Sequence, residues 1–146
     1  MTSFADSSVI VKLYVPEAGH TAVRRLERPL VISGLAVVEV TGALWRKQRL
    51  GELDPTDAAV LVRAFMADCA ETDDASRFVT IAATSAVLRH AARLVARHPL
   101  RAYDAVQLAS AMAARAALAE PMTFAAADRA LNVAAAAEGL LLAPMG

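Results

Sequence analysis

Four acidic residues lie at or near the start of a helical pattern, and together they could do chemistry: Asp6, Glu39, Asp104 and Asp128. Carboxylate oxygens are the ligands that Mg²⁺ and Mn²⁺ prefer, whereas zinc favours nitrogen and sulfur. If the fold gathers the four acids in one cleft, bound cations would relieve their mutual repulsion. Such a cation lowers the pKa of a bound water, which then becomes a nucleophile near neutral pH. The four acids therefore indicate a candidate site for metal-assisted chemistry.

Glu39 is the most informative of the four because the sequence nearby offers it no partner. The residues three and four positions away on its helical face carry no charge, and three of them are small: Leu35, Ala36, Gly42 and Ala43. Val38 and Val40 flank Glu39, so we expect the beginning of this helix to be buried. A buried Glu without a partner should be protonated, or neutralised by a group from elsewhere in the fold.

Each of the other three acids also has a simpler interpretation. Asp6 could cap the helix that follows it, and Asp128 could cap the helix that begins "DRALNV". Asp104 could cap its own helix or pair with Arg101, three positions earlier. One shared cleft would explain all four acids together, and both interpretations stay open at this point.

Short apolar runs alternate with helical patterns along the whole chain. We expect strands at 3–6, 29–33, 78–82, 121–125 and 140–143, separated by helices that include 84–97 and 7–15, which Ser7 or Ser8 could also cap. Strands spaced by helices predict right-handed crossovers and a three-layer α/β sandwich with a central parallel sheet of four to five strands. Two long helices between residues 35 and 76 have no strand between them, which predicts an additional helical hairpin.

This layout places the acids on one side of the sheet. The carboxyl ends of parallel strands and the beginnings of the following helices share one edge, and ligands bind at that edge. Asp6 ends the first expected strand, and Asp128 lies shortly after the fourth. Glu39 lies in the first turns of the helix after the second strand. The topology therefore predicts that side chains far apart in sequence meet in one cleft.

Composition and charge narrow the class of protein. The chain is 57% apolar and only 5% aromatic, and its 146 residues suit one compact domain, which we expect to span 1–146. Its formal net charge is zero, so any binding of a polyanion must depend on a local patch. Cys69 is the single cysteine, and no stretch approaches ~18 uncharged apolar residues. We therefore expect a cytoplasmic protein without a signal peptide, a disulfide framework or a membrane span.

Four segments together resemble PIN-domain proteins, and specifically the VapC-type ribonuclease toxins of bacterial toxin–antitoxin pairs: "FADSSVIVKLYVPEAG", "SGLAVVEVTGALWR", "LRAYDAVQLASA" and "TFAAADRALNVAAAAEGL". They occur in the family's order and cover essentially the whole chain. The Asp-Ser-Ser after the first expected strand and the Arg-Ala-Tyr-Asp-Ala are the most specific parts. Family members commonly carry Thr shortly before the last acid, where this chain has Ala126 and Ala127.

The resemblance implies a site, an activity and partners. Asp6, Glu39, Asp104 and Asp128 would hold Mg²⁺ or Mn²⁺, and Ser8 would support the site through a hydrogen bond to a carboxylate or to the substrate. The activity would be endonucleolytic cleavage of RNA, leaving 5′-phosphate and 3′-hydroxyl ends. The chain would form a homodimer, and the tail of a VapB-like antitoxin would cover the cleft.

RNA must also approach a negatively charged cleft, which requires cations at its rim. Arg46 lies two turns beyond Glu39 on the same helical face, and Arg101 lies close to Asp104. Both arginines could hold phosphates of the substrate. Each also has a simpler interpretation, because cations near a helix end favour the helix dipole and Arg101 could only pair with Asp104.

Two other classes of protein share some of these features. The first is a PIN-fold module that binds RNA or protein and keeps only a vestigial metal site. The second is a receiver-type signalling domain, which needs a phosphate-accepting Asp after a central strand and a Lys near the end of the fold. The third expected strand ends "FVTIA", and no Lys follows Lys47, so the sequence argues against a receiver domain.

Overall fold

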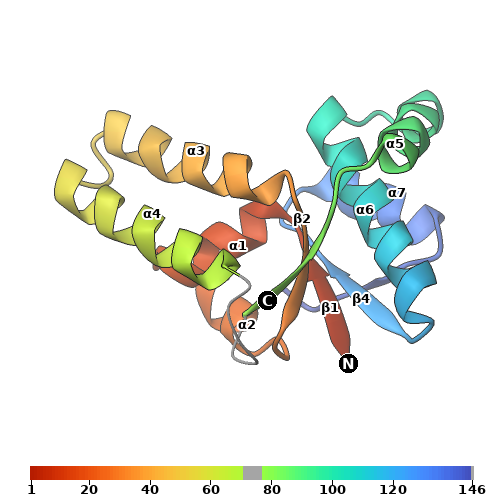
Figure 1. Cartoon of the computed structure of the whole chain (residues 1–146), viewed down its shortest axis with the longest axis horizontal. Helices are drawn as coiled ribbons and strands as arrows, with labels where there is room; N and C mark the ends of the chain where they lie inside the picture. Colours follow the sequence, from red (N-terminus) through yellow and green to blue (C-terminus); the bar gives the residue numbers. More distant parts are fainter. Residues whose placement is uncertain (71–76, 146) are drawn as a thin grey trace.

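The computed structural model describes residues 1–70 and 77–145, which fold around a parallel sheet (Figure 1). Within these residues the sheet has five strands: β1 Thr2–Ala5, β2 Leu30–Ser33, β3 Phe78–Ile81, β4 Met122–Ala125 and β5 Leu141–Leu142. Their order across the sheet is β3-β2-β1-β4-β5, and each neighbouring pair is parallel. The predicted parallel sheet is therefore confirmed, and β1 lies at its centre.

Helices connect the strands and cover both faces of the sheet. Their bounds in the described residues are α1 Ser7–Tyr14, α2 His20–Arg24, α3 Ala36–Arg49, α4 Pro55–Cys69, α5 Ser85–Arg97, α6 Ala102–Leu118 and α7 Arg129–Ala137. Figure 1 shows α1 to α4 on one side of the sheet and α5 to α7 on the other. Alternate side chains of the central strand serve the two layers: Phe4 belongs to the core formed with α5, α6 and α7, while Ala5 belongs to the core formed with α1, α3 and α4. The three-layer α/β sandwich is confirmed.

The predicted helical hairpin is formed by α3 and α4, which lie side by side and extend beyond the sheet (Figure 1). Gly51 adopts a φ of 78° in the turn between them, a conformation that glycine adopts without strain. Asp54 caps α4 by accepting a 2.8 Å hydrogen bond from the Asp57 N–H, and Pro55 is its first residue. None of the helices in the described part of the chain is long and apolar enough to cross a membrane.

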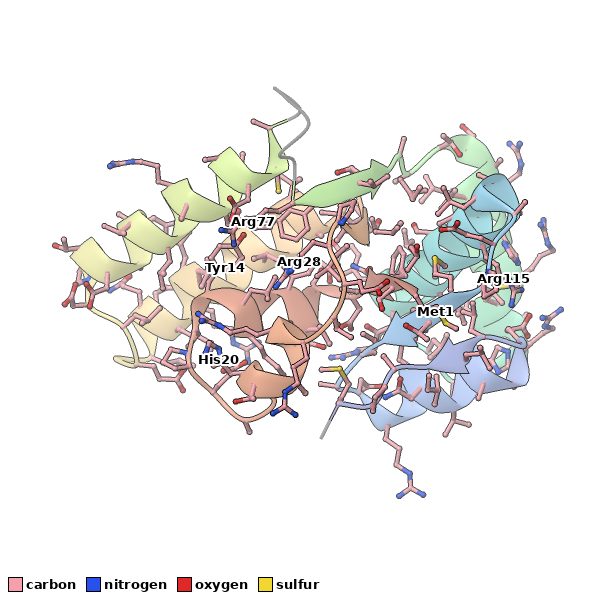
Figure 2. All side chains as sticks on the ribbon, turned by 90° about the horizontal axis from the view of Figure 1, so that it is seen from below. Met1, Tyr14, His20, Arg28, Arg77 and Arg115 are labelled. Atoms are coloured by element: carbon pink, nitrogen blue, oxygen red, sulfur yellow. The ribbon has the colours of Figure 1, made fainter. Side chains whose placement is uncertain are left out.

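A polar contact fastens the hairpin at the amino end of β3. The Tyr14 hydroxyl of α1 donates a 2.6 Å hydrogen bond to Asp68 near the end of α4. Arg77, immediately before β3, pairs with the same carboxylate at 3.5 Å. Figure 2 shows Tyr14 and Arg77 close together there. This contact lies at the opposite edge of the sheet from the carboxyl ends of the strands, so it stabilises the fold without entering the candidate site.

The strand order reverses between β1 and β4, and this reversal positions the site. From β1 the chain builds outward through β2 to β3 on one side, and through β4 to β5 on the other. In such sheets a crevice opens where the order reverses, beyond the carboxyl ends of the strands. The backbone N–H of Asp6 donates to the carbonyl of Ala125 at 3.0 Å, directly beyond the ends of β1 and β4. The first acidic residue therefore lies at the mouth of this crevice.

Candidate active site

The four acidic residues singled out in the sequence line one cavity of about 140 Å³ at the carboxyl edge of the sheet. The cavity, called the acidic pocket below, is lined by Asp6, Ser7, Ser8, Glu39, Arg101, Asp104, Gln107 and Asp128. These residues come from α1, α3 and α6, from the loop after β1, and from the residues directly before α6 and α7. The structure therefore brings together all four predicted acids, together with Ser8 and Arg101.

Asp6 is almost completely buried, with 4% of its surface exposed. Its Oδ1 accepts hydrogen bonds from the Ser8 hydroxyl at 2.7 Å and from the Val9 N–H at 3.1 Å. Burial raises the pKa of Asp6 to about 6; the two hydrogen bonds oppose that rise, and the charges of Asp104 and Glu39 add to it. The electrostatic effect of the other two acids shows that the pocket carboxylates repel one another.

The sequence offered Asp6, Ser7 and Ser8 as possible caps of α1. Asp6 is the cap, because it has the extended backbone of a cap residue and Ser7 already belongs to the helix. Ser8 instead donates to Asp6 and accepts a 3.3 Å hydrogen bond from the Ala127 N–H. Asp6 therefore serves as a helix cap and as a pocket acid, two interpretations that the sequence left open.

The surroundings of Glu39 decide one alternative that the sequence left open and differ from the prediction in one respect. The sequence nearby offered it no partner and left open a group from elsewhere in the fold; in the structure its Oε1 accepts uncharged hydrogen bonds from the Ser7 hydroxyl at 3.0 Å and from the Gln107 amide at 2.7 Å. We also expected the beginning of α3 to be buried all round, but Val38 is 71% exposed while Val40 is buried. Only one face of α3 packs on the core, and the partners of Glu39 come from α1 and α6, where local spacing could not reveal them.

Gln107 is a pocket residue that the sequence analysis did not single out. It is 2% exposed, and its Nε2 donates to Glu39 and, at 2.9 Å, to the Ser7 hydroxyl. Its Oε1 is buried and has no partner among the described residues, which costs about 1–3 kcal/mol. The sequence feature that could have identified Gln107 is its position: it lies three residues after Asp104 on the same helical face, among mostly apolar residues of α6.

The simpler interpretations of Asp104 and Asp128 also hold, alongside their place in the pocket. The Arg101 Nε donates to Asp104 Oδ2 at 3.2 Å, but most of the Arg101 side chain is exposed, so this pair contributes little to stability. Asp128 Oδ1 accepts a 2.8 Å hydrogen bond from the Leu131 N–H and caps α7. Each acid is thus held locally and also contributes to the pocket lining.

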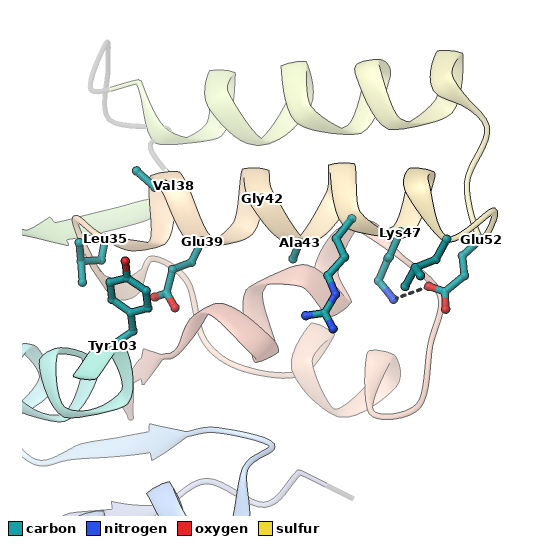
Figure 3. Close-up of a pocket in the computed structure, with 10 residues that line it drawn as sticks. Leu35, Val38, Glu39, Gly42, Ala43, Lys47, Glu52 and Tyr103 are labelled. Carbon is teal, nitrogen blue, oxygen red and sulfur yellow. Dashed lines mark hydrogen bonds and ion pairs between the residues drawn. The ribbon is translucent and has the colours of Figure 1, made fainter. Parts of the chain in front are cut away.

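Arg46 does not line the acidic pocket. It lines a neighbouring cavity of about 760 Å³ along α3, called the α3 groove below, whose other lining residues are Leu35, Val38, Glu39, Gly42, Ala43, Lys47, Leu50, Glu52 and Tyr103. Figure 3 shows the Glu39 carboxylate and the Tyr103 ring close together at one end of the groove and Lys47 with Glu52 at the other. Glu39 lines both cavities, so the groove and the pocket adjoin at this side chain.

The donor chemistry of the pocket fits a hard divalent cation, because its acids and hydroxyls offer only oxygen ligands. However, no three His, Cys, Asp or Glu side chains among the described residues are arranged as a group that could hold a metal ion. The carboxylates repel one another, and each has hydrogen bonds of its own. Coordination of one ion by three of them therefore requires the side chains to move closer together.

Comparisons with known proteins agree with this fold. Residues 3–137 match the family model of the PIN domain, so the chain belongs to the PIN domain family, whose members are generally nucleases. No curated protein matches the sequence. Among solved structures, a chain of "Toxin-antitoxin complex from Klebsiella pneumoniae" is similar, with a TM-score of 0.59, 16% sequence identity and 87% of each chain covered. At this identity the likeness shows a shared fold.

We expect Asp6→Asn to stabilise the metal-free protein at neutral pH. Burial favours the protonated form of Asp6 in the folded state. Protonation of Asp6 therefore makes its full contribution to the free energy of unfolding below pH 3.8, and this contribution is lost as the pH rises through about 6. Ionised Asp6 therefore destabilises the fold by at most about 3 kcal/mol above that pH. Asn keeps the Oδ1 acceptor but carries no charge. Urea unfolding in the presence of a chelator measures this effect. The free energy of unfolding of Asp6→Asn should exceed that of the wild type by about 1–3 kcal/mol at pH 7.5, and the difference should disappear near pH 4.

Asp54→Asn is the matched control, because Asp54 also caps a helix through Oδ1 but is exposed and lies outside the pocket. Its substitution keeps the capping acceptor and should not stabilise the protein at pH 7.5. A loss of stability at both pH values for Asp6→Asn would contradict the expectation.

Proposed function

We propose that this chain is a metal-dependent endoribonuclease, the VapC-like toxin of a toxin–antitoxin pair. The observation that carries the proposal is the convergence of Asp6, Glu39, Asp104 and Asp128 on one pocket at the crevice of a PIN-domain sheet. Membership of the PIN family supports a nuclease. The similar fold in a toxin–antitoxin complex supports the toxin role, and the sequence resemblance supports RNA as the substrate.

The four acids would hold Mg²⁺ or Mn²⁺ in the pocket. When bound, such an ion lowers the pKa of a water and offsets the charge that develops on the phosphate during hydrolysis. Ser8 and the Val9 N–H occupy Oδ1 of Asp6, and Oδ2 has no hydrogen-bond partner among the described residues. One pocket carboxylate accepts the proton of the attacking water, and the products carry 5′-phosphate and 3′-hydroxyl ends.

Arg101 and Arg46 would guide RNA to the pocket. Arg101 bonds Asp104 through Nε only, so its two terminal nitrogens are available to a phosphate. Arg46 lies in the α3 groove, which continues from Glu39. The chain has no net charge to attract RNA, so contacts of this local kind must provide the electrostatic part of the affinity.

The α3 groove supports the proposed antitoxin partner. Val38, Leu50 and Tyr103 line it and are exposed, which gives an apolar surface that the tail of a VapB-like antitoxin could cover. The groove adjoins the pocket through Glu39, so a bound tail would also block RNA. We propose further that the chain acts in the cytoplasm as a homodimer of single PIN domains spanning 1–146.

The alternative is a PIN-fold module that binds RNA or protein without cleaving it. One observation favours it: among the described residues, no three acids are already arranged to hold a metal ion. Cleavage assays separate the two functions.

Purified protein with Mn²⁺ or Mg²⁺ should cut structured RNA, and EDTA should abolish cleavage. Asp6→Asn and Asp104→Asn should each lower the rate at least about 100-fold, because each removes a charged ligand while the fold is kept. Gel analysis of end-labelled RNA measures both the rate and the end groups. Asp54→Asn serves as the control and should cut normally. A folded Asp6→Asn protein that cuts at the wild-type rate would refute the assignment.

Arg46→Glu should weaken RNA binding and reduce its salt dependence. Loss of one phosphate contact lowers the slope of log affinity against log salt by about 1. Fluorescence anisotropy over a range of salt concentrations, with EDTA to prevent cleavage, measures this slope. Arg89→Glu makes the same change of charge on α5, outside the pocket and the groove, and should have a smaller effect. Equal slopes for the two variants would remove Arg46 from the RNA-binding surface.

A further inference from the structure

We propose that Gln107 is a positioning residue of the acidic pocket: together with Ser7 it holds one oxygen of Glu39 with uncharged donors and leaves the other oxygen for a divalent cation. This inference rests on the proposed metal-dependent function. It assigns a role to an amide side chain that neither the pattern of acidic residues nor the family resemblance pointed out.

The geometry is a closed triangle of hydrogen bonds. Gln107 Nε2 lies 2.7 Å from Glu39 Oε1 and 2.9 Å from the Ser7 hydroxyl, and that hydroxyl lies 3.0 Å from the same Glu39 oxygen. The three residues come from α6, α1 and α3, so the triangle joins three separate helices at the pocket. Glu39 Oε1 is therefore fixed from two directions.

The unpaired oxygen of Gln107 shows which contact sets the orientation of the amide. Gln107 Oε1 is buried and has no partner among the described residues. Turning the amide over would not rescue it, because Oε1 would then face Glu39 Oε1, and two acceptors cannot share a hydrogen bond. The carboxylate thus dictates the orientation. An apolar side chain of the same length would fill this space without any unpaired group, so the amide serves the contacts to Glu39 and Ser7.

The two donors to Glu39, the Gln107 amide and the Ser7 hydroxyl, are uncharged, so they do not neutralise the carboxylate. An Arg or Lys in place of Gln107 would offset the charge of Glu39 and compete with a cation for it. An amide and a hydroxyl fix the carboxylate and leave its charge intact. Glu39 Oε2 has no hydrogen-bond partner within the described parts of the chain. Asp104 differs, because its partner is the charged Arg101.

Mn²⁺ titration calorimetry on the full chain tests the proposal. Gln107→Met, which removes the donor and keeps the length, should weaken Mn²⁺ binding about 10–100-fold, the usual effect of removing a group that orients a metal ligand. The melting temperature in EDTA checks that the variant is folded, since the substitution removes the unpaired Oε1 together with the two hydrogen bonds of Nε2. Ser7→Ala removes the other donor of the triangle and should also weaken binding.

A double-mutant cycle shows whether Gln107 acts through Glu39. In a Glu39→Ala background, Gln107→Met should cause no further loss of Mn²⁺ affinity. Ser110→Ala is the matched control: it removes a buried hydroxyl on the same helix that bonds Ser33 and the Val106 carbonyl outside the pocket, and it should leave Mn²⁺ affinity unchanged.

Wild-type affinity in Gln107→Met, or an equal loss in the presence and absence of Glu39, would overturn the positioning role and leave the proposed nuclease intact. A wild-type chain that takes up no Mn²⁺ would overturn both proposals together.

Discussion

Repulsion between carboxylates gathered at one edge of a sheet is the constraint on which the rest of this structure depends. Asp6 directly follows the central strand and is nearly fully buried, and the charges of Asp104 and Glu39 act on it. A fold selected for stability alone would separate such groups or pair them with cations. Here the parallel topology forces them together, because β1 and β4 end at the place where the strand order reverses.

The pocket limits this repulsion mainly through uncharged donors. Backbone N–H groups of α1 and α7 bond Asp6 and Asp128, a hydroxyl bonds Asp6, and a hydroxyl and an amide bond Glu39. The one cation with a direct contact to these acids in the described residues is Arg101, on an exposed side chain. Hydrogen bonds of this kind fix each carboxylate without cancelling its charge. The pocket therefore retains a negative potential, which is the condition a divalent cation requires.

The features that follow from local rules could be predicted from the sequence. Apolar runs gave the strands, Asp54 with Pro55 gave the beginning of α4, and alternation of strands with helices gave a parallel sheet whose edge collects the acids. The partners of Glu39 could not be predicted, because Ser7 and Gln107 lie 32 and 68 positions away and only the packing of three helices brings them together. The exposure of Val38 could not be predicted for a related reason. Some apolar residues around Glu39 belong to the core, but others, such as Val38, line an open groove, and the sequence does not distinguish the two.

Glu39 links the two cavities of this protein, and this has a consequence for how they work together. The acidic pocket is small and polar, whereas the α3 groove is several times larger and exposes Val38, Leu50 and Tyr103. The oxygen ligands of the first cavity suit a divalent cation, and the apolar lining of the second suits an amphipathic peptide. Because Glu39 lines both, a peptide that filled the groove would lie against one carboxylate of the proposed metal site. Occupation of the groove and binding of the proposed cation would then oppose each other through one side chain, which Ser7 and Gln107 hold in place.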